Sequence, residues 1–346
     1  MRRISHSAVR QVLVVRGEGK SAMRFQLGKC IGRGQFGSVY QALNLDTGQT
    51  VAVKRIRLEG LPEDEVTQLM GEVDLVKSLS HPSIVKYEGM ARDSDTLSIV
   101  LEFAENGSLG KTLKEYGKLS EELVAGYVIK ILEGLNYLHK SEVVHCDLKA
   151  ANILTTKNGN VKLSDFGVSL NLRAMEQMHD NVAGTPNWMA PEVIQLQGAS
   201  PASDIWSLGC TIIELFTGRP PYAHLNNGLS VMFRIVEDES PPIPEDCSDE
   251  LKDFLSQCFE KDPADRPTAE LLGEHPWLKQ NWGVHKELRP QDSIPFLRRV
   301  SADLHSRADI TKQFMDSPRF SSSTCDLEPS PPRQHTFVKS SFSQGR

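Results

Sequence analysis

The chain has 346 residues, of which 39% are hydrophobic and 24% are charged, and its net charge is −6. This length allows a full buried core, two lobes and a tail. The sequence contains no long basic block, so its charge pattern predicts neither a nucleic acid nor an anionic membrane surface as a partner.

The six cysteines lie far apart and form no Cys-x-x-Cys pair, which argues against a zinc site and against a disulfide framework. Reduced thiols inside the cell are the simpler interpretation. The apolar run at residues 12–15 is too short for a signal peptide, and no other run is long enough to cross a membrane. We therefore expect a cytoplasmic or nuclear protein without membrane insertion.

Residues 1–24 are expected to form an N-terminal extension. Its apolar run at residues 12–15 fits either a short strand that caps the next domain or part of a disordered, partner-binding arm. So short a run does not decide between the two.

A β-rich pattern follows. Apolar or β-branched runs at residues 27–31, 38–43 and 50–56 predict three strands, and residues 32–37 form a glycine-rich turn between the first two. Because glycine has no side chain, the main-chain amides of this turn can approach phosphate groups closely. A similar glycine pattern in dinucleotide-binding folds opens a helix, whereas Val39-Tyr40 continues a strand.

Lys54 follows the apolar run Val51-Ala52-Val53, so its ammonium group lies in a buried strand, where an unpaired charge is costly. After Pro62, apolar residues recur at helical spacing, and Glu72 interrupts the edge of their stripe. Glu72 is therefore the expected partner of Lys54. The alternative is a Glu in an exposed salt bridge.

Two further elements lead to the most polar motif. Residues 96–103 predict a strand, and residues 120–140 predict a long amphipathic helix whose apolar face belongs to the core. The helix delivers the chain to residues 143–154. There, polar residues between two apolar pairs predict a loop between two short buried strands.

The side chains of this loop suit phosphoryl transfer. Asp147 can accept a proton from an attacking hydroxyl, Lys149 can neutralise a transferring phosphoryl group, and Asn152 can offer an oxygen to a divalent metal. A salt-bridged surface turn is the alternative for the loop alone. Asp165, in Asp165-Phe166-Gly167, supplies a second metal ligand, a carboxylate, and argues against that alternative.

With these motifs in order, the sequence resembles the eukaryotic protein kinase family from residue 25 to residue 279. The resemblance implies an α+β, bilobal protein kinase fold with a small β-rich N-lobe and a larger, mostly helical C-lobe. It also implies that ATP and Mg²⁺ bind between the lobes and that protein Ser or Thr hydroxyls receive the γ-phosphoryl group.

The family's functional positions map onto individual residues of this chain. Asp147 corresponds to the catalytic Asp, Lys149 to the lysine typical of Ser/Thr kinases, and Thr185 to a residue that hydrogen-bonds both. Asn152 and Asp165 correspond to the Mg²⁺ ligands. The implied nucleotide-binding residues, with main-chain groups of the hinge facing the adenine, are Ile31, Gly32, Gly34, Gly37, Val39, Ala52, Lys54, Glu72, Leu101, Glu102, Ala104 and Leu154.

Cys146 departs from the family, most members of which have Arg at this position. In regulated members, a phosphate on the activation segment pairs with that Arg. Residues 171–183, where this phosphate is usually attached, contain no Ser, Thr or Tyr. We therefore hypothesise that loop phosphorylation is not the main switch. An alternative is that Glu176 or Asp180 takes the place of the phosphate.

Residues 203–217 predict a central buried helix, in which Asp204 needs hydrogen-bond donors. The resemblance implies that Asp204 holds the catalytic-loop backbone. It also implies that Glu192 and Arg266 form a buried ion pair that anchors the activation segment. His81, His139 and His275 are expected to pack or cap, not to bind metal.

From residue 280 onward the sequence is rich in Ser, Pro and Arg and poor in aromatic residues, which predicts a disordered tail. Residues 294–315 have some helical periodicity within it. The chain ends in low-complexity sequence, which suggests a fragment of a longer protein.

The sequence resembles the STE group of MAP-kinase-kinase-kinase-like enzymes in three stretches, residues 105–109, 184–192 and 218–222. Residues 145–152 and 55–59 most resemble the septation initiation network kinases of fungi, the sepH type. This resemblance implies control of cytokinesis and septum formation, a downstream kinase as the protein substrate, and recruitment to the spindle pole body by a Ras-like small GTPase.

Three other interpretations compete with this one. A pseudokinase scaffold would bind partners without turnover, but the chain retains every expected chemical group. A small-molecule kinase is disfavoured because Ala190-Pro191-Glu192 and the long activation segment build a peptide-docking surface. A MAP-kinase-kinase-kinase of another pathway is the third.

Overall fold

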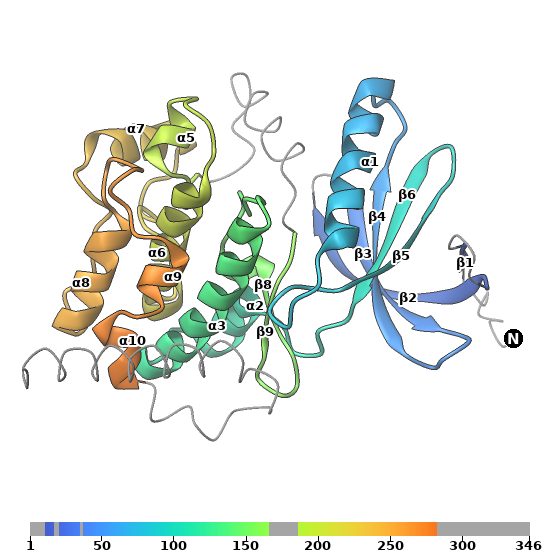
Figure 1. The fold of residues 1–346 in the computed structure, drawn as a ribbon, viewed down its shortest axis with the longest axis horizontal. Coiled ribbons are helices and arrows are strands. Elements are labelled where there is room, and N and C mark those ends of the chain that lie inside the picture. The colour runs from blue at the N-terminus through green and yellow to red at the C-terminus, as the bar shows by residue number, and fades with distance from the viewer. Residues whose placement is uncertain (1–10, 17–20, 35–36, 166–185, 282–346) are drawn as a thin grey trace, which may run out of the picture. The chain divides into compact units, whose positions relative to one another are not determined.

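The structure is a computed structural model, and its description covers residues 11–16, 21–34, 37–165 and 186–281 (Figure 1). The side chains of Gln68, Glu72 and Leu75 lie outside this description. Several sequence predictions therefore fall on residues outside it, namely Thr185, the Phe166-Gly167 pair, residues 171–183 with Glu176 and Asp180, and the tail from residue 282.

The N-terminal part is one antiparallel sheet with the strand order β1-β2-β3-β4-β6-β5. The three strands predicted at residues 27–31, 38–43 and 50–56 are confirmed as β2, β3 and β4. The strand bounds are β1 Val12–Val15, β2 Met23–Gly34, β3 Gly37–Asn44, β4 Thr50–Arg57, β5 Tyr87–Arg92 and β6 Thr96–Glu102.

Strand β1 decides between the two interpretations of the N-terminal run, because it pairs with β2 as a capping strand. Its Val15 is 1% exposed. A Cβ atom added to Gly89 of β5 would lie 2.9 Å from Val15 Cγ1. Since β1 and β5 are the two edge strands and also meet, the sheet curls around a core that includes Phe25 and Val100.

Helix α1 (Glu63–Ser78) forms a second hydrophobic core with the sheet (Figure 1). Glu63, Asp64 and Glu65 occupy its first turn, where the helix dipole favours negative charge. Buried side chains on α1, such as Leu69 and Val73, contribute about 1.5–3 kcal/mol each. Hydrophobic packing therefore positions the helix that carries Glu72.

The C-terminal part is mostly helical, as predicted, and the longest helices, α3 and α6, contact each other in its core. A small sheet has the strand order β7-β8-β9. The elements are β7 Gly107–Ser108, α2 Leu109–Tyr116, α3 Glu121–Lys140, η1 Ala150–Asn152, β8 Ile153–Thr155, β9 Val161–Leu163, α5 Pro191–Ile194, α6 Pro201–Thr217, α7 Gly228–Glu237, α8 Asp249–Cys258, α9 Ala269–Leu272 and α10 Pro276–Asn281.

Helix α6 has clear boundaries. Ser200 and Ser203 form a capping box at its start, Pro201 occupies its first turn, and Gly218 ends it in the left-handed conformation with φ 82°. Most of its residues are buried, including Trp206. The predicted central buried helix is therefore confirmed.

One local prediction was wrong. Residues 143–154 were expected to carry a short strand on each side of a polar loop, but only β8 is a strand, and Val143-Val144 is irregular. The reason lies in the hydrogen bonds that follow Val144. The amides of His145 and Cys146 donate to the Asp204 carboxylate instead of to a neighbouring strand.

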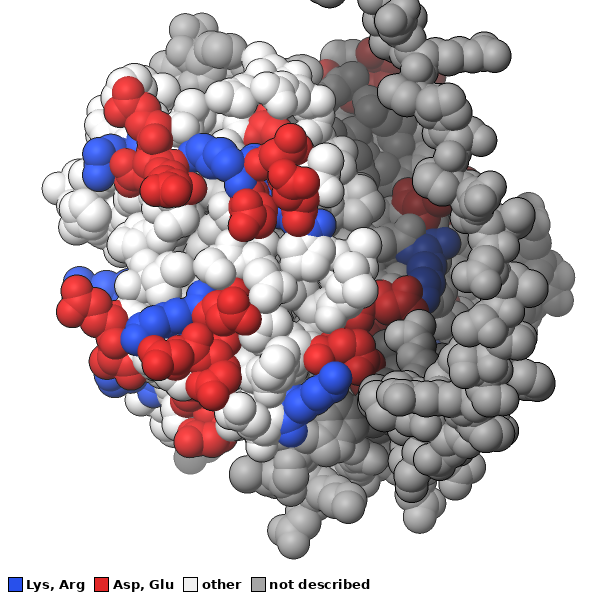
Figure 2. All heavy atoms as spheres, turned by 60° about the vertical axis from the view of Figure 1, so that its left-hand side comes forward, with Lys and Arg blue, Asp and Glu red and all other residues white. Residues whose placement is uncertain are grey.

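On the face drawn in Figure 2, acidic and basic side chains of the described residues lie together in small clusters. Exposed pairs such as Lys252 with Asp249, whose Nζ and Oδ1 atoms are 3.1 Å apart, typically contribute less than about 1 kcal/mol. Within the described ranges, no helix is both long and apolar enough to cross a membrane. The five cysteines of these ranges form no disulfide with one another.

Candidate active site

The loop that carries Asp147 is held from behind by helix α6. The Asp204 carboxylate accepts from the amides of His145 (2.8 Å) and Cys146 (3.0 Å), as predicted. Thr211 Oγ1 donates to the Leu148 carbonyl (3.4 Å), and the Ala150 amide donates to Glu214 Oε2 (3.0 Å). At 100° per residue these three α6 positions share one face, so a single rigid helix sets the loop's path.

Cys146 lies at the bend of this path. Its φ is 63°, in the left-handed region that non-glycine residues seldom adopt and that costs of order 1–3 kcal/mol. The amides of His145 and Cys146, which lead into this bend, both donate to Asp204. His139 Nε2 lies 2.8 Å from Asp204 Oδ2 and is thus a packing and hydrogen-bonding residue, as expected.

Asp147, Lys149 and Asn152 form one cluster. Lys149 Nζ donates to Asp147 Oδ1 (2.7 Å), and Asn152 Nδ2 donates to Asp147 Oδ2 (2.7 Å) and to the Asp147 carbonyl (2.8 Å). The amide nitrogen of Asn152 is therefore turned toward Asp147. The structure brings these three predicted residues together.

Asp165 lies beside this cluster. Ser164, the residue before it, donates to the Asn152 carbonyl through both its amide (3.0 Å) and its hydroxyl (2.9 Å). Ser164 thus ties the two predicted metal ligands to each other through its amide and its hydroxyl. Asp165 itself has φ 56°, again in the left-handed region.

Lys54 pairs with Asp165, with 2.7 Å between Nζ and Oδ1. Withdrawal from solvent raises the pKa of the Asp165 carboxyl, but the charge and hydrogen bond of Lys54 outweigh this effect, so that pKa lies below its ordinary value. Asp165 is consequently ionised at neutral pH. Because the Glu72 side chain lies outside the description, the Lys54–Glu72 pair stays a prediction.

Strand register places several predicted nucleotide-binding residues near one another. Val39 pairs with Lys54 between β3 and β4, and Ala52 pairs with Leu101 between β4 and β6. Glu102 ends β6, and Ala104 follows it. The remaining predicted positions are Ile31, Gly32 and Gly34 in β2, Gly37 at the start of β3, and Leu154 in β8.

Gly37 has a structural requirement that the sequence argument missed. A Cβ atom at this position would lie 1.9 Å from the carbonyl oxygen of Arg55 in β4. Strand β3 can approach β4 this closely only because residue 37 is glycine. A Cβ at Gly32, by contrast, would make only ordinary contacts with Val39.

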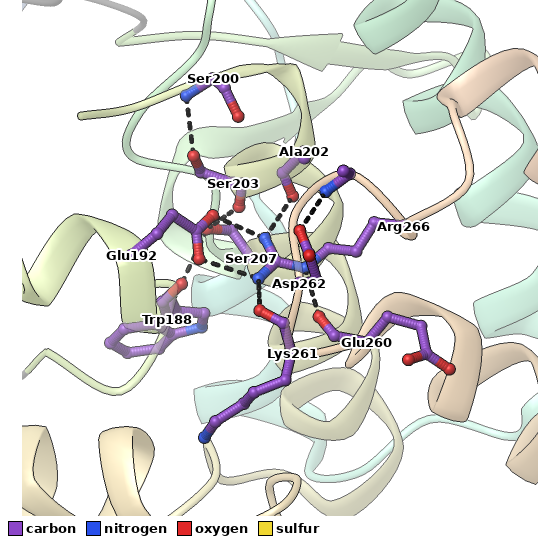
Figure 3. A network of polar contacts seen from close by, with 11 residues as sticks. Trp188, Glu192, Ser200, Ala202, Ser203, Ser207, Glu260, Lys261, Asp262 and Arg266 are labelled. Carbon is purple, nitrogen blue, oxygen red and sulfur yellow. Dashed lines mark hydrogen bonds and ion pairs between the residues drawn. The ribbon is translucent and has the colours of Figure 1, made fainter. Parts of the chain in front are cut away.

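Glu192 and Arg266 form the predicted buried pair (Figure 3), with Arg266 Nη1 and Nη2 donating to Oε1 (2.6 Å) and Oε2 (2.8 Å). Arg266 also donates to the carbonyls of Glu260, Ala202 and Lys261. All three nitrogens of the Arg266 guanidinium group thus donate hydrogen bonds. This prediction is confirmed.

Sequence reasoning missed Ser207, Thr211, Glu214 and Trp188. Trp188 Nε1 donates to Glu214 Oε2 (2.9 Å), and Ser207 Oγ donates to the Trp188 carbonyl (2.7 Å). A usable signal was present, since Ser207, Thr211 and Glu214 follow Asp204 at spacings that return to one helix face.

Comparison with known proteins agrees with this geometry. The family model for the protein kinase domain matches residues 25–278. The chain therefore belongs to the protein kinase family, as the resemblance predicted.

Its relatives include cytokinesis protein sepH of Emericella nidulans, 54% identical over 254 residues, which are 73% of this chain and 19% of that protein. Cell division control protein 7 of Schizosaccharomyces pombe is 44% identical over 315 residues (86% and 29%). MAP3K epsilon protein kinase 1 of Arabidopsis thaliana is 46% identical over 282 residues (81% and 20%). The chain thus spans less than a third of each of these relatives.

Proposed function

We propose that this chain transfers the γ-phosphoryl group of Mg²⁺-ATP to Ser or Thr hydroxyls of a protein substrate. The observation that supports this most is the Asp147–Lys149–Asn152 cluster on a loop that α6 holds at four main-chain groups. Phosphoryl transfer depends on positioning and electrostatics more than on covalent chemistry, and this cluster provides both.

In this proposal, Asp147 accepts the proton of the attacking hydroxyl. Its Oδ1 and Oδ2 atoms each receive one hydrogen bond, from Lys149 and Asn152, so the carboxylate is held in one orientation before the substrate arrives. Lys149 lies within the same cluster and stabilises negative charge on the transferring group. Thr185 is proposed to hydrogen-bond both residues.

The donor set of Asn152 and Asp165 fits Mg²⁺, which prefers oxygen ligands. The Asp165 carboxylate is ionised and already holds a cation, the Lys54 ammonium group, at 2.7 Å. Asn152 turns its nitrogen toward Asp147, which leaves its oxygen as the group for a metal. When bound, Mg²⁺ would neutralise charge on the phosphates.

Lys54 is proposed to hold the α- and β-phosphates, with Glu72 orienting it. The Lys54–Asp165 pair is partly exposed, at 32% and 41% of the side chains, so Lys54 can exchange Asp165 for a phosphate without leaving a buried charge behind. The other nucleotide-binding residues assigned by the resemblance complete this proposed site. The proposed kinase domain is residues 25–279, after an extension at residues 1–24 and before a tail at residues 280–346.

Two relatives are named for cytokinesis and cell division control, so we further propose that the chain acts in a cascade that controls cytokinesis and septum formation. A downstream kinase would be the substrate and a Ras-like small GTPase the partner that recruits the protein to the spindle pole body. A MAP-kinase-kinase-kinase of another pathway is the alternative, supported by the MAP3K epsilon relatives.

Phosphotransfer from Mg²⁺-ATP to a generic Ser/Thr substrate tests the proposal, with phosphatase-treated wild type compared with Asp147→Asn. The treated wild type is expected to be active, because Cys146 replaces the phosphate-binding Arg, and Asp147→Asn is expected to lose about 10²–10⁴-fold in rate. If phosphatase treatment abolishes the activity, the hypothesis that loop phosphorylation is not the main switch is wrong. An inert wild type would leave the scaffold interpretation.

A further inference from the structure

Two arginines of the N-terminal sheet stand on either side of a serine. Arg33 in β2 pairs with Ser38 in β3, and Ser38 pairs with Arg55 in β4. Because directly paired residues of antiparallel strands point to the same side of the sheet, these three side chains form a row, called here the arginine row. Its two arginines are about 10 Å apart at their main chains, so a group above Ser38 can contact both.

The arginine row lies on the face of the sheet opposite the proposed nucleotide site. Val53, two residues before Arg55 and on the same side of β4, belongs to the core that β1 covers. Lys54 alternates with them and points to the other side, as does Ile56, which packs with helix α1. The row is therefore separate from the proposed phosphate contacts of Lys54, although Arg33 lies within the glycine-rich turn.

The hydrogen-bond donors of the arginine row are incompletely used. Arg33 is exposed and pairs with no carboxylate of the described residues. Arg55 donates from Nη1 to Gln11 Oε1 (2.8 Å), while its Nε atom is buried without a partner in the described part of the chain. The residues paired with Arg55 in the sheet are Ser38 and Ser98, neither of which is acidic.

This donor set suits a phosphate group. A phosphate monoester carries a charge of about −1.5 to −2 at neutral pH and three strong acceptor oxygens. It can therefore accept from a guanidinium group on each side and from the Ser38 hydroxyl between them. A single carboxylate has half that charge and fewer oxygens for two opposed arginines.

The chain itself supplies the occupant. Gln11, which bonds Arg55, is the residue at which residues 1–10 join the described part of the chain. Ser5 is six residues before Gln11, and a chain of this length spans up to about 20 Å. Ser5 also follows Arg2-Arg3, a pattern typical of sites that are phosphorylated by kinases that recognise basic residues.

We propose that Arg33, Ser38 and Arg55 form a phosphate-binding site and that phosphorylated Ser5 of the same chain occupies it. A protein kinase transfers the γ-phosphoryl group of ATP to the serine oxygen, which loses its proton, and ADP leaves. Residues 1–16 contain four arginines and no acidic residue, so the unmodified segment is repelled from the row and the phosphate reverses this. The bound phosphate then joins the glycine-rich turn to β4 from outside the nucleotide site.

The test uses the full chain with phosphoserine incorporated at position 5. Phosphorus NMR follows the second ionisation of this phosphate, whose ordinary pKa is about 6. Two neighbouring guanidinium groups should lower that pKa by about one pH unit. Arg33→Gln and Arg55→Gln should each return it towards about 6. Arg92→Gln is the matched control, because Arg92 pairs with Leu97 on the other face of the sheet and its loss should change nothing.

Two results of this titration would overturn the proposal. One is a pKa of about 6 in the chain with intact arginines, and the other is a lowered pKa that Arg33→Gln leaves unchanged. Because Arg33 is exposed, Arg33→Gln decides the question even if Arg55→Gln does not fold. A lowered pKa that depends on protein concentration would place the phosphate on a second copy, and the assignment to the same chain would be wrong.

Hydrogen exchange distinguishes a tethered phosphate from a free one. Phosphorylation at Ser5 should slow exchange in residues 32–38, and Arg33→Gln should remove this effect. Inorganic phosphate at about 0.1 mM should not protect the unmodified chain, because a short tether supplies an effective concentration in the millimolar range. If free phosphate at this concentration protects residues 32–38 as well as phosphorylated Ser5 does, the row is a site for free phosphate and the assignment to Ser5 is wrong.

Discussion

Two ion pairs differ in their surroundings. Lys54 and Asp165 are 32% and 41% exposed, and they connect strand β4 to the segment after β9. The side chains of Arg266 and Glu192 are 0% and 5% exposed. The five hydrogen bonds of Arg266 use all three nitrogens of its guanidinium group. Both pairs have short contacts, at 2.7 and 2.6 Å.

The difference in exposure indicates that the two ion pairs have different roles. An exposed pair contributes little to stability and can exchange one partner for another, which suits a lysine that must also bind phosphates. A buried pair cannot lose a partner without leaving a charge in the core. We therefore expect the first pair to affect activity and the second to affect folding.

The largest effect is expected from Arg266→Met. It leaves Glu192 charged and buried, which should lower the free energy of unfolding by about 3–5 kcal/mol. Urea unfolding measures this loss. Lys252→Met, which breaks the exposed pair with Asp249, is the control and should cost less than about 1 kcal/mol. A similar loss for both variants would remove the distinction between buried and exposed pairs.

Lys54→Met is expected to have the opposite profile. It should lower kcat/KM about 10²–10³-fold, because one preorganised charge at the phosphates is lost. Its free energy of unfolding should change by less than about 1 kcal/mol, since the pair with Asp165 is partly exposed. Parallel phosphotransfer assays and urea unfolding check this split. A large stability loss with near-normal activity would contradict it.

Much of the candidate site could be predicted from the sequence, because its motifs are short and local. The Asp147–Lys149–Asn152 cluster occupies six consecutive positions. Burial in an apolar helix indicated that Asp204 needs hydrogen-bond donors, whereas its contact with the catalytic loop and the Glu192–Arg266 pair were implied by the resemblance to the family. Lys54 illustrates the opposite case. Burial in a strand predicts that it needs an anion, but the observed partner, Asp165, comes from a segment 111 residues away.

Glu214 and Gly37 show what local patterns leave out. The glycine-rich turn suggested close approach to phosphates, whereas Gly37 is also required by the Arg55 carbonyl of the next strand. Glu214 resembles any polar residue near the end of a helix until the fold brings Ala150 and Trp188 to one of its oxygens. Helical spacing places Glu214 on the same face as Asp204, but it does not tell which segments the fold brings to that face.

Strand β1 extends the comparison of buried and exposed groups to apolar side chains. Val15 is 1% exposed, whereas Val14, one residue earlier on the same strand, is 46% exposed. Val15→Ala should lower the free energy of unfolding by about 1–2 kcal/mol, from two lost methyl groups. Val14→Ala should change it by less than about 0.5 kcal/mol. Equal values in urea unfolding would mean that β1 does not cover the sheet in solution.

The smallest effect is expected at Glu214, as a dependence of stability on pH. Burial raises the pKa of its carboxyl, although the bonds from Ala150 and Trp188 and the charge of Lys149 partly oppose this. A raised pKa in the folded state means that the stabilising contribution is present below the unfolded pKa, about 4.3, and is lost as the pH rises through the folded value.

The variant Glu214→Gln has no carboxyl proton to lose at this position. The stability of the Gln variant relative to wild type should therefore increase from about pH 4 toward neutrality, which thermal unfolding across that range would measure. A difference that stays constant with pH would show that Glu214 gains no proton on folding, and the raised pKa of its carboxyl would then be wrong.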